Sequence, residues 1–142
     1  MSSLASERCG VLGVIVPADR ANATTNSSAI DLSKFPRVLF ILQLGTIDTT
    51  VDFKLQESAT TGGTFTDIAG KSITQLTATD DNKQAVIELE SPELGAGKRY
   101  ARCVFTSGAG TACLSSVVVL GVDPRFGPAT DDDLASVAQV VS

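Results

Sequence analysis

Residues that usually carry enzymatic chemistry are sparse in this chain. It contains no histidine, so the side chain most often used for proton transfer near neutral pH is missing. A Ser–His–Asp or Cys–His nucleophile therefore cannot be assembled within one chain. The glycine-rich stretch Gly108-Ala109-Gly110 lacks the Lys-Ser/Thr pair and the following helix of a phosphate-binding loop. The sequence predicts no catalytic residues and a protein that is not an enzyme.

Clustered carboxylates offer two candidate cation sites, because hard cations prefer several oxygen ligands. Asp131-Asp132-Asp133 and Asp80-Asp81-Asn82 lack the alternating ligand spacing and the distal glutamate of a calcium loop. We interpret them as a helix N-terminus and a solvated turn. Glu88 and Glu90 share one face of a predicted strand, which is more typical of the wet side of a sheet than of a glycosidase pair. We predict no metal and no cofactor.

The three cysteines, Cys9, Cys103 and Cys113, form an odd set without the spacing of metal ligands. The main interpretation is three buried thiols that pack as small apolar side chains. The alternative is a disulfide between Cys103 and Cys113 across a hairpin. It requires a loop of odd length centred on Gly108, because a shift of one residue would place the two side chains on opposite faces.

Composition describes a single folded domain. The chain has 142 residues, is 43% hydrophobic and carries a net charge of -5, with its 11 Lys and Arg residues scattered along the sequence. This distribution argues against nucleic acid as a partner, since phosphate binding needs clustered cations. No stretch approaches the roughly 20 apolar residues that cross a membrane. The N-terminus also lacks a basic flank leading into an apolar segment, so we expect no secretory signal.

Two hydrophobic patterns stand out. Val38–Leu42 is continuously apolar, which predicts a strand covered on both faces, and Val117–Leu120 has the same character. Val51–Gln56 alternates between apolar and polar residues, as expected of a strand with one wet face. We expect Arg37–Leu44 and Thr50–Glu57 to be antiparallel neighbours. The second cover of the apolar runs must then come from a helix or from another subunit.

About seven or eight such segments separated by turn signals predict an all-β fold. We expect an antiparallel β-sandwich, Ig-like or jelly-roll-like, with an extended N-terminal arm and a short C-terminal helix. Arg99–Thr106 and Ala112–Leu120 are predicted to form a hairpin. The domain organisation follows as an N-terminal arm or edge segment (1–28), the sandwich (29–121) and a C-terminal tail with the helix (122–142).

The predicted C-terminal helix begins at Thr130 or Asp131, where a side-chain oxygen can cap it. Its apolar residues recur at helical spacing and form one stripe: Leu134, Val137, Ala138 and Val141. Such a stripe must lie on the protein's own sheet or on a neighbouring molecule.

Several blocks of the sequence carry a resemblance to a known family. In chain order these blocks are Ile30–Phe40 (IDLSKFPRVLF), Thr50–Ser58 (TVDFKLQES), Phe65–Lys71 (FTDIAGK), Ile73–Ala78 (ITQLTA), Asp81–Gln84 (DNKQ), Arg99–Arg102 (RYAR) and Gly121–Pro128 (GVDPRFGP). In this order and spacing, over about residues 20 to 142, the chain is similar to small virion proteins of tailed bacteriophages that are found beside the major capsid protein.

The resemblance implies a non-enzymatic capsid decoration, or cement, protein that stabilises the phage head by binding the major capsid protein. It further implies a homo-oligomer, with a trimer favoured, made in the host cytoplasm and located in the virion. It transfers no catalytic residue. Two alternatives stay open. One is a head–tail connector or tail component, and the other is a sandwich-type module that binds glycans or cations, suggested by the segment Glu57–Ile68.

The residues predicted to matter most are therefore contact residues near the two ends of the chain. The interface candidates are Val11, Val14, Val16, Pro124, Arg125, Phe126, Leu134, Val137 and Val141. The alternative for each of them is packing within its own chain.

Overall fold

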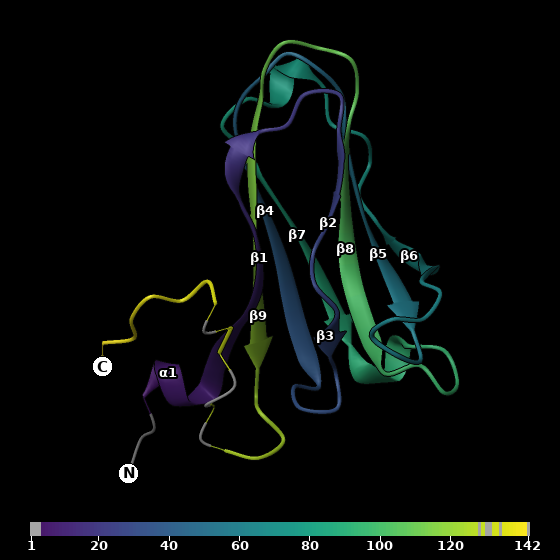
Figure 1. The fold of residues 1–142 in the computed structure, drawn as a ribbon, viewed down its shortest axis with the longest axis vertical. Helices are drawn as coiled ribbons and strands as arrows, with labels where there is room; N and C mark the ends of the chain where they lie inside the picture. Colours follow the sequence, from purple (N-terminus) through teal and green to yellow (C-terminus); the bar gives the residue numbers. More distant parts are fainter. Residues whose placement is uncertain (1–3, 128, 130–131, 134, 142) are drawn as a thin grey trace.

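The protein is built from two antiparallel β-sheets packed face to face, which confirms the predicted all-β sandwich (Figure 1). A computed structural model of the chain describes residues 4–127, 129, 132–133 and 135–141. The strands are β1 (Cys9–Asp19), β2 (Thr24–Asn26), β3 (Ile30–Asp31), β4 (Arg37–Ile47), β5 (Val51–Ser58), β6 (Thr66–Ser72), β7 (Gln84–Glu90), β8 (Tyr100–Ser107) and β9 (Cys113–Val122). The helical elements are the short helix α1 (Ala5–Arg8) and two 3-10 turns (Ala78–Asp80 and Ser91–Glu93).

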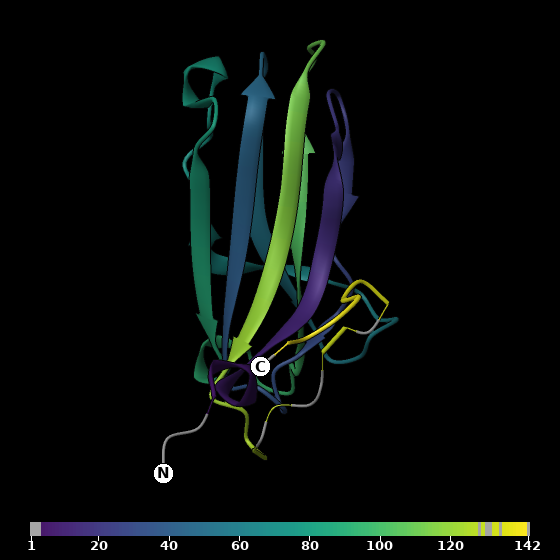
Figure 2. The same cartoon turned by 90° about the vertical axis from the view of Figure 1, so that its left-hand side faces the viewer.

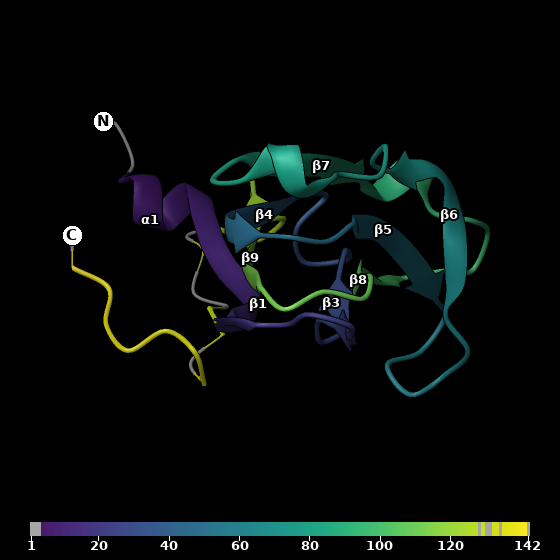
Figure 3. The same ribbon diagram turned by 90° about the horizontal axis from the view of Figure 1, so that it is seen from above.

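The two sheets differ in size and in strand order. The four-stranded sheet has the order β1-β9-β4-β7, and Figure 2 looks onto its outer side. The five-stranded sheet has the order β2-β8-β5-β6, with β3 paired to β8. Seen from above, the two sheets form separate layers (Figure 3). Because most neighbouring strands, with the exception of β5 and β6, come from distant parts of the chain, the fold depends on long-range pairing.

The core lies between the two layers and follows the period-two alternation of the strands. In β4, Val38, Phe40 and Leu42 are completely buried, whereas the residues between them are partly exposed. From the facing sheet, Phe53 and Leu55 of β5 enter the same core. The continuous apolar run therefore has one face in the core and the other on the outside of the sandwich.

The predicted antiparallel pairing of Arg37–Leu44 with Thr50–Glu57 and the predicted hairpin of Arg99–Thr106 with Ala112–Leu120 are both wrong. Strands β4 and β5 lie in different sheets, and so do β8 and β9, so both connections are arches between the layers (Figure 1). The arches meet at Asp48, whose carboxylate accepts hydrogen bonds from the amides of Thr111 (3.0 Å) and Ala112 (2.9 Å) and from the Thr111 hydroxyl. These hydrogen bonds, that of the hydroxyl first, lower the pKa of the Asp48 carboxyl. Asp48 thus holds the two arches side by side.

The N-terminal region is part of the sandwich. Strand β1 forms one edge of the four-stranded sheet and pairs with β9 along its length, from Cys9 opposite Val122 to Asp19 opposite Leu114. Two irregularities interrupt the pairing, between Val11 and Gly13 and again before Ala18.

The C-terminal helix predicted from Thr130 is not found in the described residues of the tail. Instead, Asp133 begins a single turn, in which its carbonyl accepts hydrogen bonds from the amides of Ser136 (3.0 Å) and Val137 (2.8 Å). The physical reason is competition for the same polar groups. The Asp132 carboxylate and the Asp133 amide, which would lie in the first turn of that helix, bind the backbone of Val11 in β1 instead (2.8 and 2.6 Å). Three residues of the predicted helix lie outside the described part of the chain: Thr130, Asp131 and Leu134.

All three cysteines are free thiols, and the Cys103–Cys113 hairpin disulfide has no structural basis. Cys103 lies in β8 and Cys113 in β9, on opposite sheets, and both are completely buried. Burial raises the pKa of each of these two thiols. Cys9 is only half-buried, so the prediction of three buried thiols holds for two of them.

This difference in burial predicts selective modification of the native protein. A thiol reagent added to the native protein should react rapidly with Cys9, whereas Cys103 and Cys113 should react only after unfolding. Peptide mass spectrometry after brief labelling, with and without urea, measures this. Comparable labelling of Cys113 and Cys9 in the native state would contradict the placement of β9.

Two neighbouring residues of β4 test which face enters the core. Leu42→Ala should lower the free energy of unfolding by about 2–5 kcal/mol, because it opens a cavity at a fully buried site. Ile41→Ala, on the outer side, should cost about 1 kcal/mol or less. Urea unfolding at low protein concentration, followed by circular dichroism, measures both. Equal losses would show that both faces of β4 lie in a core.

Candidate functional site

The outer side of the four-stranded sheet carries a row of apolar residues that crosses all four strands. Val118 of β9 pairs with both Val14 of β1 and Ile41 of β4, and Ile41 pairs with Val86 of β7. Because directly paired residues point to the same side of a sheet, these four side chains form one band. Val14, Ile41 and Val118 are half-buried and Val86 is 56% exposed.

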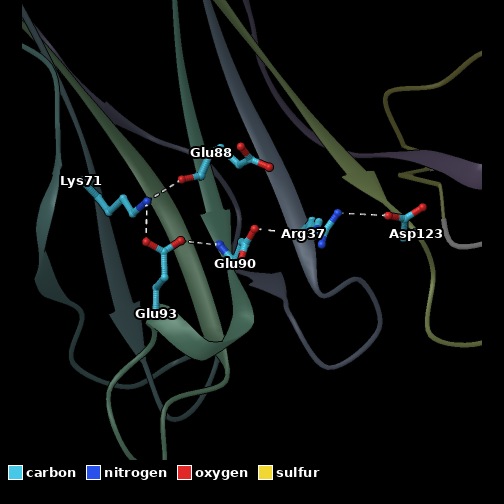
Figure 4. A network of polar contacts seen from close by, with 6 residues as sticks. All are labelled: Arg37, Lys71, Glu88, Glu90, Glu93 and Asp123. Carbon is cyan, nitrogen blue, oxygen red and sulfur yellow. Dashed lines mark hydrogen bonds and ion pairs between the residues drawn. The ribbon is translucent and has the colours of Figure 1, made fainter.

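A second row lies beside the first. Leu120 of β9 pairs with Val11 of β1 and Leu39 of β4, and Leu39 pairs with Glu88 of β7. The row is apolar on three strands and ends in a carboxylate at the sheet edge. The Glu88 carboxylate points away from Lys71 (Figure 4) and has no hydrogen-bond or ion-pair partner in the part of the chain that the structure describes.

Above these rows the surface becomes polar but carries no charge. The amide of Gln43 donates to Gln84 on β7 (3.4 Å), and the hydroxyl of Ser116 on β9 lies 3.5 Å from the Gln43 side-chain oxygen. Two large apolar side chains flank this polar row, Val16 (58% exposed) and Leu114 (45% exposed).

We call this surface the outer face. Its apolar residues are Val11, Val14, Val16, Leu39, Ile41, Val86, Leu114, Val118 and Leu120. Figure 2 shows the sheet open along most of its length, with α1 and the C-terminal segment only at its lower end. The two adjoining apolar rows form one band, and an exposed apolar band of this kind is typical of contact sites.

The lower end of the outer face is bounded by an arginine that lies between two carboxylates. Arg37, at the start of β4, lies between Glu90 (3.7 Å) and Asp123 (3.7 Å), as Figure 4 shows. All three side chains are about half exposed, so these ion pairs contribute little to stability. The Arg37 guanidinium is therefore already paired within its own chain.

The edge of the sheet at β7 is covered by a lysine from the opposite sheet. The ammonium of Lys71 in β6 donates to the carbonyl of Glu88 (2.8 Å) and forms an ion pair with Glu93 (2.7 Å). The hydrogen bond from Lys71 holds the pKa of the Glu93 carboxyl below its ordinary value, and Glu93 also accepts from the amide of Glu90 (2.8 Å). Charged side chains at such an edge prevent another strand from pairing with it.

The opposite edge, at β1, is covered by the C-terminal tail. The Val11 amide donates a hydrogen bond to the Asp132 carboxylate, and the Val11 carbonyl accepts one from the Asp133 amide. Further down, the amide of Ala129 donates to the carbonyl of Glu7 (2.8 Å). The upper part of this strand contains Pro17, which has no N–H to offer. Both edges of the sheet are therefore protected, while its outer face is not.

The structure brings the three N-terminal interface candidates together. Val11 and Val14 lie in the two apolar rows, and Val16 lies above them on the same strand. Sequence reasoning missed the residues that complete this surface on the other strands: Leu39, Ile41, Val86, Leu114, Val118 and Leu120. The signal for most of them was the two continuous apolar runs, whose second face needed a cover.

The C-terminal candidates are placed differently. Arg125 is held within its own chain, since its guanidinium donates to the carbonyl of Ser33 (2.7 Å). Pro124 and Val137 are half-buried, and Phe126 is 82% exposed. Val141 is also exposed, whereas the candidate Leu134 lies outside the described residues. The tail does reach the lower end of the outer face, where Asp132 and Val140 line a pocket together with Val11 and Leu120.

Polar residues on the outside of the five-stranded sheet are paired with one another. Asp67 accepts hydrogen bonds from Lys54 (3.0 Å) and Gln56 (2.9 Å), and the Gln56 oxygen accepts from Arg102. The Arg102 guanidinium stacks on the ring of Phe65 at 4.2 Å and covers it. This is an ordinary solvated sheet surface, without an open aromatic platform for sugar stacking.

Features of other site classes are absent from the described residues. No group of three or more His, Cys, Asp or Glu side chains there could hold a metal ion. In the same part of the chain, no helix has the length and apolar character needed to span a membrane.

The chain was compared with protein families, curated proteins and solved structures. No family model matches the chain, and no curated protein matches it. A structure of Bacillus endospore appendages, described as a novel family of disulfide-linked pili, matches with a TM-score of 0.50 and 12% identity, covering 87% of this chain and 96% of that one. A family 4 carbohydrate-binding module (CBM4) matches with a TM-score of 0.43 and 17% identity, over 79% of this chain and 70% of the module.

A glycoside hydrolase domain, Endo-D from Streptococcus pneumoniae R6, matches with a TM-score of 0.39 and 19% identity. This match covers 74% of this chain but only 17% of the hydrolase chain. At 12% identity, the match to the endospore appendage structure shows a likeness of fold and nothing about shared chemistry.

The contact between the tail and β1 yields a prediction. Asp132→Ala should lower the free energy of unfolding by about 1 kcal/mol and speed hydrogen exchange of the Val11 amide, which loses its acceptor. Asp133→Ala is the control, because its carboxylate accepts from the Ser136 hydroxyl (2.8 Å) and does not contact Val11. Amide exchange measured by NMR compares the two. Unchanged exchange at Val11 in Asp132→Ala would mean that the tail does not protect this edge.

Proposed function

We propose that this protein is a non-enzymatic structural component of a tailed-bacteriophage virion, a capsid decoration protein that binds the major capsid protein. In this proposal it is made in the host cytoplasm, assembles onto the phage head and associates with copies of itself. The resemblance of its sequence blocks to small virion proteins supports the phage context. The sandwich fold agrees with such a role, although many other proteins share it.

The main support for a structural role is the outer face of the four-stranded sheet, which is uncovered while both edges of that sheet are protected. A protein that stabilises a shell acts by burying surface against its neighbours, and apolar area supplies most of the driving force for association. The outer face provides such area on a rigid, hydrogen-bonded sheet. Protected edges direct association to this face and away from uncontrolled strand pairing.

Copy number in purified virions tests the proposal. We expect the protein at a fixed ratio to the major capsid protein, measured by quantitative mass spectrometry with labelled peptides of both proteins as standards. A decoration protein is present at capsomer stoichiometry, whereas a connector or tail component forms a single ring. Absence from virions, or only a few copies in each particle, would overturn the decoration role.

A further inference from the structure

We propose that the outer face of the four-stranded sheet packs against the same face of a second copy, forming a face-to-face dimer. This inference deepens the structural role proposed above and rests on it, because it names the first partner of that surface. The resemblance alone implies a trimer, so the two assemblies make different predictions.

The protected edges indicate that association occurs through the face. Continuing the sheet at β1 would require the Val11 backbone to release Asp132 and Asp133, and the next part of that strand contains Pro17. Continuing it at β7 would require displacing Lys71 from the Glu88 carbonyl. The outer face needs no such rearrangement, because nothing described in the chain lies over its central row (Figure 2).

The dimensions of the outer face suit a dimer. Four strands at a spacing of about 4.8 Å give a width of ~19 Å. The 11 residues of β4 give a length of ~36 Å at about 3.3 Å each. The whole outer side of the sheet, including the lower end beside α1 and the C-terminal segment, projects to ~700 Å², which approaches the roughly 800 Å² that each partner contributes to a standard stable interface. Two apolar sheets also pack readily at a distance of about 10 Å, as the two layers inside the sandwich do.

The chemistry of the outer face is complementary to itself. Its central rows are apolar, and its upper row consists of Gln43, Gln84 and Ser116, whose side chains both donate and accept hydrogen bonds. When the strands of the two copies run in the same direction, this polar row meets its own counterpart and the apolar rows meet each other. At the lower end, Arg37 is already paired within its own chain and calls for no external anion.

Glu88 fits this arrangement because of its position. It lies on the edge strand β7, so its unpaired carboxylate can remain in water at the rim of a dimer. A different protein that bound the outer face mainly through electrostatic attraction would instead need a basic side chain opposite Glu88.

A contact between identical faces closes with two copies. Each copy uses its single apolar face, and the outside of the five-stranded sheet, with its paired polar residues, stays in solvent. The dimer therefore leaves no second apolar sheet face that would extend the assembly, and contact with the capsid falls to other exposed residues, such as Phe126 and Val141 of the tail.

The test is the solution mass of the full chain and of two charge-matched variants. Light scattering coupled to size exclusion should give twice the chain mass of 14.7 kDa. Ile41→Lys, at the centre of the outer face, should weaken dimerisation by about 30-fold or more, the size of an interface hot spot. Thr106→Lys is the matched control, on the far side of the sandwich beside Asp52, and should leave the mass unchanged. Circular dichroism establishes that each variant is folded.

If Ile41→Lys does not fold, Val86→Lys replaces it in the test. Val86 lies at the exposed rim of the same row, where a lysine can be accommodated without disturbing the core. This variant should also weaken the dimer. A monomer at all concentrations, a trimer, or a folded Ile41→Lys or Val86→Lys protein that dimerises as strongly as the parent would overturn the inference. A dimer that is missing from virions would refute the proposed function alone, whereas a monomeric component of the virion would refute this inference alone.

Discussion

Strand β4 is the element on which the rest of the structure depends. It is hydrogen-bonded on both sides, to β7 and to β9, and its side chains are apolar on both faces. Successive side chains of a strand must point to opposite sides, so only one of these faces can enter the core of a two-layer sandwich. Phe40 and its inward neighbours fill that core, and Ile41 is left outside. The uncovered apolar surface is thus a direct geometric consequence of where this strand lies.

Around this strand, polar groups serve mainly to close the ends and edges of the sandwich. Asp48 ties the two arches together at one end, and Lys71 bridges from one sheet to the other at the edge beside β7. Asp132 joins the C-terminal tail to β1. Each of these groups uses a side chain to satisfy backbone donors or acceptors that strand pairing leaves free. The molecule is therefore polar where strands could be added and apolar where a flat surface could be covered.

The pattern of apolar residues was sufficient to recognise the strands but not their partners. The segments around Phe40 and Phe53 were expected to be neighbours in one sheet because they are adjacent in the sequence. They instead face each other across the core, and the same error affected the segments that contain Cys103 and Cys113. A short connection between two strands can be a hairpin or an arch, and alternation is identical in both cases. The choice depends on distant strands, here β7 and β9 beside β4, which local sequence does not specify.

The sequence by itself determined the all-β class, the absence of histidine-based chemistry and the need for a second cover over Val38–Leu42, since these follow from composition and period-two alternation. Only the tertiary structure decided that residues from four strands combine into one outer face, because side chains far apart in the chain become neighbours only through pairing register. The tertiary structure also decided the conformation of the C-terminal tail. The aspartates expected to begin a helix bind the backbone of Val11 instead, because an unpaired sheet edge offers them stronger partners than an isolated short helix would.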